Sequence, residues 1–249
     1  MRNILILGGT TEATALAQLL AERRERAVLS YAGRVDSPRA QPIPVRTGGF
    51  GGVQGLVEYL CVNNVTHLVD ATHPFAAQMS ANAVAGARQA GVPLVALTRP
   101  AWQPVPGDDW QRVPDIPAAV QALAGGSRRI FLALGRMHLA EFAAQPQHHY
   151  ILRLVDPPVG RLPLPDATVI VSRGPFTVEG DREVMQDHGV DIVVCKNAGG
   201  DGASAKLAAA RELGLPVLMI DRPVLPPRRE VHEVAEVLEW LDHSANLGV

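Results

Sequence analysis

The stretch that decides the fold is NILILGGTTE at residues 3–12, where an apolar run leads directly into two glycines. Residues 3–7 are predicted as a buried strand, and from residue 11 onward the apolar side chains recur at helical spacing. Glycines allow a ligand to approach the backbone closely, and the unpaired N–H groups of the new helix can receive a phosphate. Because the loop lacks the complete GxGxxG pattern, it is compatible both with a nucleotide site and with an ordinary tight turn.

The same alternation of strand and helix patterns continues over the first hundred residues. Further strands are predicted at 28–31, 45–46, 67–71 and 92–97, and helices at 11–26, 53–61 and 74–90. Five prolines between residues 100 and 117 then interrupt the rhythm, as at a boundary between lobes. We therefore predict one lobe over residues 1–100 and a second lobe over residues 101–249.

The second lobe repeats this pattern. Strands are predicted at 130–134, 150–154, 168–171, 192–194 and 217–220, and helices at 118–124, 137–144, 178–188, 203–213 and 230–242. Such alternation is typical of α/β proteins with mostly parallel sheets. Ligands of these sheets bind beyond the carboxyl ends of the strands, so we expect a ligand cleft between the two lobes.

Composition and charge narrow the function classes. The chain has 249 residues, 47% of them apolar, which is sufficient for a large core. Its apolar runs are far shorter than the roughly 20 residues of a membrane helix, and the early first strand leaves no room for a signal segment. We therefore expect a cytoplasmic protein that has no membrane partner. The net charge of −2 argues against a nucleic-acid surface, and Cys61 and Cys195 match no metal spacing, so no metal is predicted.

The strand ends of the first lobe indicate a preference among dinucleotides. The loop after the first strand contains Gly8, Gly9, Thr10, Thr11 and Glu12. The second strand ends near Ser30, followed by Gly33 and Arg34, with no acidic residue before Asp36. An acid at this place commonly binds the ribose of NAD, whereas a 2′-phosphate requires hydroxyls, amides or arginine. The pattern favours NADP, and the alternative is that Arg34 is an ordinary solvated residue.

Another strand of the first lobe, at 67–71, is followed by Thr72 and His73. A hydroxyl and an imidazole thus lie close to the start of the next helix. A single histidine is more often structural than catalytic, but its position at a strand's carboxyl end makes both roles equally plausible for His73.

Cations follow four of the five strands predicted in the second lobe. They are Arg136, Arg173, Lys196 and Arg222. Several cations at neighbouring strand ends indicate an anionic ligand. Lys196 and Lys206 are the only lysines of the chain, and Ser204 and Lys206 begin the helix that follows Lys196. We therefore expect both lysines to point at one site.

Other chemistries lack their motifs. None of the three tyrosines, Tyr31, Tyr59 and Tyr150, is followed four residues later by the lysine that short-chain dehydrogenases use. HExxH, GxSxG and GxxxxGK[ST] are also absent, which removes the main signals for zinc hydrolysis, α/β-hydrolase chemistry and P-loop phosphoryl transfer.

Six motifs, taken in order, resemble the precorrin-6A reductase family of corrin biosynthesis. They are GGTTEA at 8–13, DATHPFA at 70–76, RP at 99–100, SRGPF at 172–176, KNAGG at 196–200 and DRP at 221–223. Each motif alone is weak, but their order and spacing are specific and extend over nearly the whole chain.

The resemblance implies two Rossmann-like lobes with a nicotinamide cofactor in the cleft between them. It implies reduction of one ring double bond of precorrin-6A by a nicotinamide cofactor, for which the strand ends favour NADPH. The product would be precorrin-6B on the route to vitamin B12, and neighbouring pathway enzymes are candidate partners. A macrocycle that carries many carboxylates accounts for strand ends rich in arginine, because the guanidinium fork matches carboxylate geometry.

Residue roles follow from this resemblance together with the positions of the loops. We expect contacts to the cofactor phosphates from Gly8, Gly9, Thr10, Thr11 and Glu12, to the 2′-phosphate from Ser30, Gly33 and Arg34, and to the ribose or nicotinamide from Thr72, His73, Thr98 and Arg99. We expect the tetrapyrrole to bind Arg136, Arg173, Lys196, Asn197, Ser204 and Arg222, with Lys206 serving either ligand. Catalysis would rest largely on placement of the reactants. If the protein donates a proton, His73 is the first candidate and Lys196 the second.

Alternative functions remain open at the level of sequence. Many cobalt-branch relatives have a hydroxyl residue before the equivalent of Gly135, where this chain has Leu134. Leu134 and Arg34 thus favour the metal-free substrate and NADPH over cobalt-precorrin-6A and NADH. The further alternatives are another nucleotide-dependent enzyme, such as a nucleotide-sugar reductase or a methyltransferase, and a non-catalytic nucleotide-sensing module.

Overall fold

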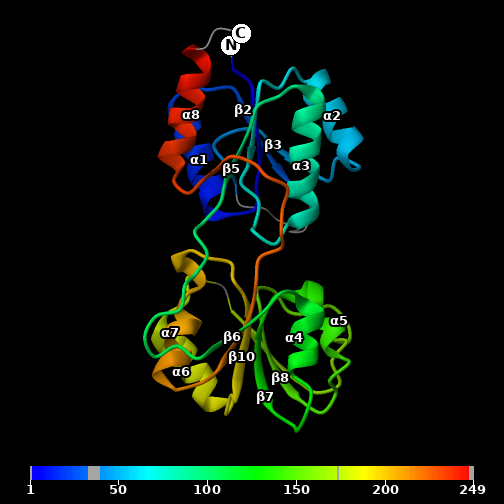
Figure 1. Cartoon of the computed structure of the whole chain (residues 1–249), viewed down its shortest axis with the longest axis vertical. Helices are drawn as coiled ribbons and strands as arrows, with labels where there is room; N and C mark the ends of the chain where they lie inside the picture. Colours follow the sequence, from blue (N-terminus) through cyan, green and yellow to red (C-terminus); the bar gives the residue numbers. More distant parts are fainter. Residues whose placement is uncertain (1, 33–39, 173, 247–249) are drawn as a thin grey trace. The chain divides into compact units, whose positions relative to one another are not determined.

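The computed structural model describes residues 2–32, 40–172 and 174–246 of the chain. The chain divides into two units, one formed by Met1–Arg99 with Val224–Val249 and the other by Pro100–Pro223. Each unit is built on a six-stranded sheet, and all strand pairs in the described residues are parallel (Figure 1). The predicted α/β class with parallel sheets is therefore confirmed.

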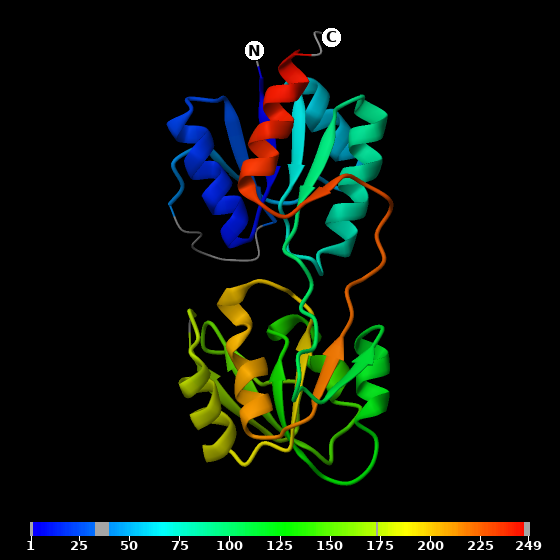
Figure 2. The ribbon, with the colours of Figure 1, turned by 60° about the vertical axis from the view of Figure 1, so that its left-hand side comes forward.

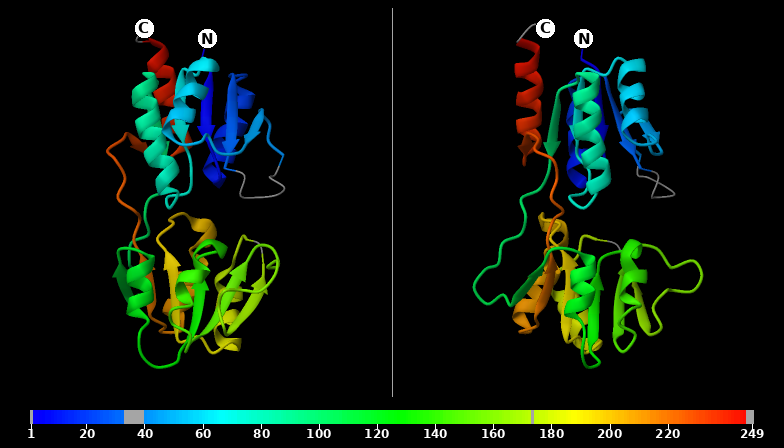
Figure 3. Two further views of the ribbon diagram at one scale, coloured as in Figure 1. Left: turned by 90° about the vertical axis from the view of Figure 1, so that its right-hand side faces the viewer. Right: turned by 45° about the vertical axis from the view of Figure 1, so that its right-hand side comes forward.

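The sheet of the first unit has the strand order β12-β5-β4-β1-β2-β3. Its strands are β1 (Ile4–Leu7), β2 (Ala27–Tyr31), β3 (Val45–Thr47), β4 (His67–Asp70), β5 (Leu94–Leu97) and β12 (Glu230–Val231). It is covered by α1 (Thr11–Glu22), α2 (Val53–Val62), α3 (Ala77–Ala90) and α8 (Val234–Asn246). Along β1, Ile4 and Ile6 join a core with residues of α1 and α8, whereas Leu5 and Leu7 join a core with residues of α2 and α3. The ribbon shows these helices packed along the sheet (Figure 3). Both faces of β1 are thus buried, as its uninterrupted apolar sequence predicts.

The sheet of the second unit has the strand order β6-β11-β10-β7-β8-β9. Its strands are β6 (Trp110–Val113), β7 (Arg129–Ala133), β8 (His149–Leu154), β9 (Ala167–Val171), β10 (Ile192–Lys196) and β11 (Val217–Ile220). Its helices are α4 (Ile116–Ala122), η1 (Arg136–His138), α5 (Leu139–Phe142), α6 (Val178–Asp187), η2 (Asp201–Ala203) and α7 (Ala205–Glu212). Phe131, Val193 and Cys195 form one core with residues of α6 and α7.

The C-terminal segment belongs to the first unit, which corrects the predicted boundary. The sequence pattern predicts residues 101–249 as one lobe, but only the residues up to Pro223 pack into the second unit. From Val224 the chain returns to the first sheet, where β12 pairs with β5 (Figure 2). Leu238 and Leu241 of α8 then enter the core that contains α1. Periodicity reveals the apolar face of a helix but not which sheet that face covers, so the sequence alone misassigns this segment.

Two edge strands lie where the sequence predicts none. β6 lies inside the proline-rich stretch, and β12 occupies the start of the helix predicted at 230–242. Both strands are short and pair on one side only, so side-chain alternation hardly shows in them. No helix of the described residues combines the length and the apolar character that crossing a bilayer requires.

His67 on β4 joins the sheet to the C-terminal helix. Its buried ring meets the ring of Trp240 in α8 edge-on, with centroids 5.3 Å apart. Burial, and to a smaller extent the positive charge of Arg2, lowers the pKa of His67 below its usual 6.5, whereas the charge of Glu25 acts in the opposite direction. The native state therefore favours the neutral ring.

The pH dependence of the free energy of unfolding should include a contribution from His67. Because the folded pKa is lowered, the stabilising contribution is fully present above pH 6.5 and is lost as the pH falls through the folded pKa. We predict that His67→Gln flattens the fall in stability below pH 6.5, measured by urea unfolding at a series of pH values. The exposed His243 offers a matched control, His243→Gln. Identical pH slopes for the wild type and His67→Gln would contradict the assignment.

Candidate functional site

Parallel pairing brings the expected residues of the first unit to one edge of its sheet. Leu7 of β1 lies opposite Ser30 of β2 and Asp70 of β4, and Leu97 of β5 lies opposite Val231 of β12. The segments that follow these positions therefore share an edge. They contain Gly8, Gly9, Thr10, Thr11, Glu12, Thr72, His73, Thr98, Arg99 and His232. Among the described residues, no group of three His, Cys, Asp or Glu side chains could hold a metal ion.

The glycine loop combines tight packing with an open surface. A Cβ atom on Gly8 would lie 2.5 Å from Cδ1 of Leu29, so glycine lets this turn pack against β2. Gly9 has a φ of 133°, a conformation that favours glycine, and no atom lies within 4 Å of the place its Cβ would take. The backbone is therefore accessible at Gly9.

The first turn of α1 is held by side chains of the loop itself. The Thr10 hydroxyl accepts a hydrogen bond from the first turn of α1 at 3.1 Å and donates one to the carbonyl of Ala71 at 2.9 Å. Thr11 donates to Glu12 at 3.1 Å, and Glu12 forms an ion pair with Nε of Arg99 at 2.9 Å. Thr10 thus joins the loops that follow β1 and β4, and Arg99 neutralises the acid beside the glycine turn.

An arginine that the sequence analysis missed lies at the ends of β2 and β3. Arg46 donates from Nη1 to Oγ of Ser30 at 2.9 Å and to the carbonyl of Gly48 at 2.7 Å, and from Nη2 to the carbonyl of Gly49 at 3.0 Å. Its guanidinium carbon lies 3.8 Å from the centre of the Phe50 ring. The sequence did offer a signal for this residue: Arg46 closes the third predicted strand of the first lobe and lies next to the glycine-rich stretch 48–52. Gly33, Arg34 and Arg173 lie outside the described residues.

Thr72 and His73 follow β4 in a hydrogen-bonded turn. Asp70 accepts from the backbone N–H of Thr72 at 3.2 Å and from its hydroxyl at 2.7 Å, and that hydroxyl lies 3.3 Å from Oγ of Ser80 in α3. Nδ1 of His73 accepts from the N–H of Phe75 at 3.2 Å. Because Nδ1 accepts, the neutral ring carries its proton on Nε2, which can therefore act as a donor.

Asp70 also forms a buried ion pair with Arg228. The two side chains are 1% and 6% exposed, and Arg228 donates from Nε to Glu230 at 3.1 Å. Arg228 lies in the segment that returns to this sheet as β12. The carboxylate of Asp70 therefore links the returning segment to the turn that carries Thr72 and His73. Sequence analysis could not predict this contact, because the two residues are far apart in the sequence.

Thr98, at the end of β5, contacts the same returning segment. Its N–H donates to the carbonyl of Val231 at 3.0 Å, and its own carbonyl accepts from Nδ1 of His232 at 2.7 Å. The backbone N–H groups of His232 and Glu233 hold the pKa of Glu236 below its usual value. His232 was missed because the sequence predicts a helix, not a strand end, at this position.

In the second unit, the expected residues Lys196, Asn197 and Arg222 lie close together. Lys196 ends β10, and Arg222 donates from Nε to the carbonyl of Asn197 at 3.0 Å and from Nη2 to that of Ala198 at 3.1 Å. The buried side chain of Asn197 accepts from the N–H of Trp102 at 2.8 Å and donates to its carbonyl at 3.0 Å. Asn197 therefore shapes the loop that places Arg222. Arg136 is exposed in η1, directly after β7.

The side chains of Ser204 and Lys206 contact other residues of the second unit. Ser204 donates to the carbonyl of Asp201 at 2.8 Å. Lys206 donates to the carbonyl of Ala203, and its Nζ lies 4.8 Å from the centre of the Trp102 ring. Burial lowers the pKa of Lys206 below its usual value. Its surroundings do not support the expectation that it faces a ligand, and it contrasts with the half-buried Lys196.

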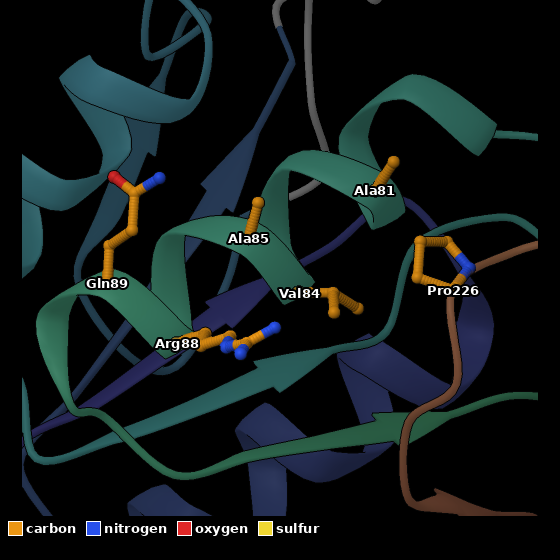
Figure 4. A pocket seen from close by; sticks show the side chains of 6 residues that line it. All are labelled: Ala81, Val84, Ala85, Arg88, Gln89 and Pro226. Atoms are coloured by element: carbon orange, nitrogen blue, oxygen red, sulfur yellow. The ribbon is translucent and has the colours of Figure 1, made fainter.

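A hollow of about 550 Å³ lies on α3 (Figure 4). It is lined by Ala81, Val84, Ala85, Arg88, Gln89 and Pro226. These side chains are mostly apolar and follow the middle and C-terminal half of α3, whereas the strand-end loops precede its first turn. None of the expected site residues lines this hollow.

Comparisons with known proteins agree over the whole chain. The family model described as "Precorrin-6x reductase CbiJ/CobK" matches residues 3–242. A precorrin-6A reductase from Rhodobacter capsulatus is 58% identical over 98% of this chain and 98% of its own length. A cobalt-precorrin-6A reductase from Priestia megaterium is 30% identical over 88% of this chain and 90% of its own length. A solved structure of a "CobK precorrin-6A reductase" matches with a TM-score of 0.93 and 57% identity, covering 98% of this chain and 97% of that one.

The buried pair at Asp70 gives a prediction about stability. Asp70→Asn removes the buried partner of Arg228 and leaves only the ion pair with Glu230, whose side chain is 45% exposed, so we expect the free energy of unfolding to fall by up to about 3–5 kcal/mol. Asp242→Asn is the matched control, because Asp242 pairs with Arg2 and Arg23 while its side chain is 50% exposed. We expect that control to cost about 0–1 kcal/mol. Equal losses for the two variants, measured by urea unfolding, would contradict the buried pair.

Proposed function

The chain belongs to the precorrin-6x reductase family, and on that premise we propose that NADPH is its reductant and that each unit binds one of the two ligands. The chain is an oxidoreductase that reduces precorrin-6A, a tetrapyrrole intermediate of cobalamin biosynthesis. When bound, the reduced nicotinamide supplies a hydride. In the proposal, residues of the first unit bind and orient this cofactor, and residues of the second unit bind the carboxylates of the tetrapyrrole.

The observation that carries the cofactor proposal is the open glycine loop after β1. The space beside Gly9 and the start of α1 suit a pyrophosphate, which helix N–H groups stabilise. Gly8, Gly9, Thr10 and Thr11 supply this loop. The pairing of Glu12 with Arg99 supports the proposal, because it offsets an acid that would otherwise repel the phosphates.

The end of β2 supports NADPH over NADH. Ser30 offers a hydroxyl there, and no acidic residue follows it before Asp36. A carboxylate at this position would favour the free ribose hydroxyls of NADH and repel a 2′-phosphate. Gly33 and Arg34, which lie outside the described residues, remain the proposed partners of that phosphate.

Thr72, His73 and Thr98 are the proposed contacts at the nicotinamide end. The turn from Asp70 to Phe75 fixes the backbone around His73 and leaves Nε2 as the proton-bearing nitrogen of the neutral ring. We assign His73 the role of proton donor to the reduced double bond, with Lys196 as the second candidate. Orientation of the two reactants supplies the remainder of the rate enhancement.

The second unit supports binding of a polycarboxylate. Arg136, Arg173, Lys196 and Arg222 are the proposed cations, and Asn197 acts through the loop that it holds in place. Ser204 and Lys206 contribute from within the unit, by holding the turn and the Trp102 ring. Guanidinium groups suit this ligand, because they bind carboxylates through two parallel hydrogen bonds.

The metal-free substrate is supported by the comparisons. The relative from Rhodobacter capsulatus, at 58% identity, is a precorrin-6A reductase, whereas the cobalt-precorrin-6A reductase from Priestia megaterium is 30% identical. Leu134, in place of a hydroxyl residue before Gly135, points in the same direction.

The cofactor proposal is tested by following NADPH absorbance. NADPH should be oxidised only when precorrin-6A is added. The value of kcat/KM with NADPH should exceed the value with NADH. Cobalt-precorrin-6A serves as the comparison substrate. Equal kcat/KM values for the two nucleotides would overturn the choice of NADPH while leaving the reductase activity in place.

The role of His73 predicts a specific kinetic defect. General acid catalysis contributes about 10²–10⁴-fold, so His73→Ala should lower kcat by roughly this factor. The dissociation constant of NADPH should change far less, because the phosphates are bound by other residues. His243→Ala, at an exposed ring of α8, is the control. An unchanged kcat in His73→Ala would remove this side chain from the mechanism.

A further inference from the structure

We propose that Arg46 recognises the 2′-phosphate of the dinucleotide and thereby determines the preference for NADPH. This inference rests on the proposed function, since it names a residue that reads the group distinguishing NADPH from NADH. It concerns a side chain in the short strand β3, one strand away from Ser30 and outside the glycine loop after β1.

The side chain of Arg46 is a cation that neutral groups hold in place. Its hydrogen bonds to Ser30, Gly48 and Gly49 all go to neutral oxygens, and among the described residues no carboxylate pairs with it. Arginine has five N–H donors, of which these bonds use three. The guanidinium therefore retains its charge and donor capacity for an anionic ligand.

Other partly buried arginines of the first unit behave differently. Arg2 pairs with Glu25, Arg99 with Glu12 and Arg228 with Asp70. Each of these arginines is neutralised locally, as burial of a charge requires. Among the described partly buried arginines of the first unit, Arg46 differs in that its hydrogen bonds go to neutral oxygens, which suits it to bind an anionic ligand.

Two aromatic rings, those of Phe50 and Tyr59, help to hold the guanidinium of Arg46 in place. Phe50 lies 3.8 Å from the guanidinium carbon, and its ring meets Tyr59 of α2 edge-on, with centroids 5.2 Å apart. The centre of the Tyr59 ring lies 5.1 Å from the same guanidinium carbon. The close approach of this loop to α2 depends on Gly55, where a Cβ atom would lie 1.7 Å from the Phe50 carbonyl oxygen. A preformed cation binds its ligand at lower entropic cost.

The position of Arg46 in the sheet fits the 2′-phosphate. Ser30 pairs with Leu7, which precedes the glycine loop, and also with Arg46 on the other side. β3 therefore lies two strands from β1, about 10 Å at ~4.8 Å per strand. An adenosine that extends from the glycine loop across β2 would bring its ribose to Ser30 and a 2′-phosphate to Arg46. Such a phosphate can accept two charge-assisted hydrogen bonds from the guanidinium fork.

The test compares nucleotides with and without this phosphate on the full chain. Dissociation constants for NADPH, NADH, 2′,5′-ADP and 5′-ADP are measured by calorimetry for the wild type, Arg46→Gln and Arg46→Lys. We expect Arg46→Gln to weaken NADPH and 2′,5′-ADP binding by about 10–100-fold, as loss of charged hydrogen bonds predicts. Binding of NADH and 5′-ADP should change by less than about threefold, because those ligands lack the phosphate. Arg46→Lys keeps the charge and should show a smaller loss.

Arg26→Gln is the matched control, because it removes the same charge from an exposed position before the amino end of β2. It should leave all four constants unchanged. A wild type that prefers NADPH together with an Arg46→Gln variant that keeps the preference would overturn this inference while the proposed function stands. Equal weakening of NADPH and NADH would also overturn it, by showing a structural role for Arg46. A wild type without any preference would overturn the NADPH proposal and this inference with it.

Discussion

In a parallel sheet every strand ends at the same edge, and the buried strand β1 fixes where that edge lies in the first unit. Both faces of β1 are covered by helices, and β2 and β4 pair with it on either side. The chain therefore leaves each strand at one place, where loops are free of sheet hydrogen bonds and helices begin. The glycine turn, the Ser30 hydroxyl and the turn carrying His73 meet there because of this geometry. The same rule applies within the second unit, at the ends of β7, β10 and β11.

The first unit is completed by the far end of the sequence. β12 adds an edge strand beside β5, and Arg228 and His232 bring side chains from the returning segment to Asp70 and Thr98. The loops that are proposed to meet the nicotinamide therefore depend on contacts between residues more than a hundred positions apart. Because Arg228 neutralises the buried carboxylate that also holds Thr72, the Thr72–His73 turn and the returning segment stabilise each other.

Much of this arrangement could be predicted from local sequence. Apolar runs such as residues 4–7 identified the strands, and alternation with helical patterns identified the parallel α/β class, because both depend on neighbouring residues. The destination of α8, the strand β12 and the partners Arg228 and His232 could not be predicted, because they depend on contacts between distant segments. Lys206 shows a second limit. Its place at the start of a helix suggested a ligand, but its burial against Trp102 is a property of the packed unit.

Arg46 illustrates a third limit, since a cation in a short strand beside a glycine-rich stretch is only a weak sequence signal of an anion site. Its significance depends on the neutral oxygens and aromatic rings that surround it.

The central claim is that the strand-end edge of the first unit binds the dinucleotide. It is tested most directly by amide hydrogen exchange of the full chain with and without NADP⁺. The account predicts slower exchange in peptides covering residues 8–14, 46–53 and 70–76. Protection confined to peptides of residues 100–223, with no change in residues 8–14, would contradict it.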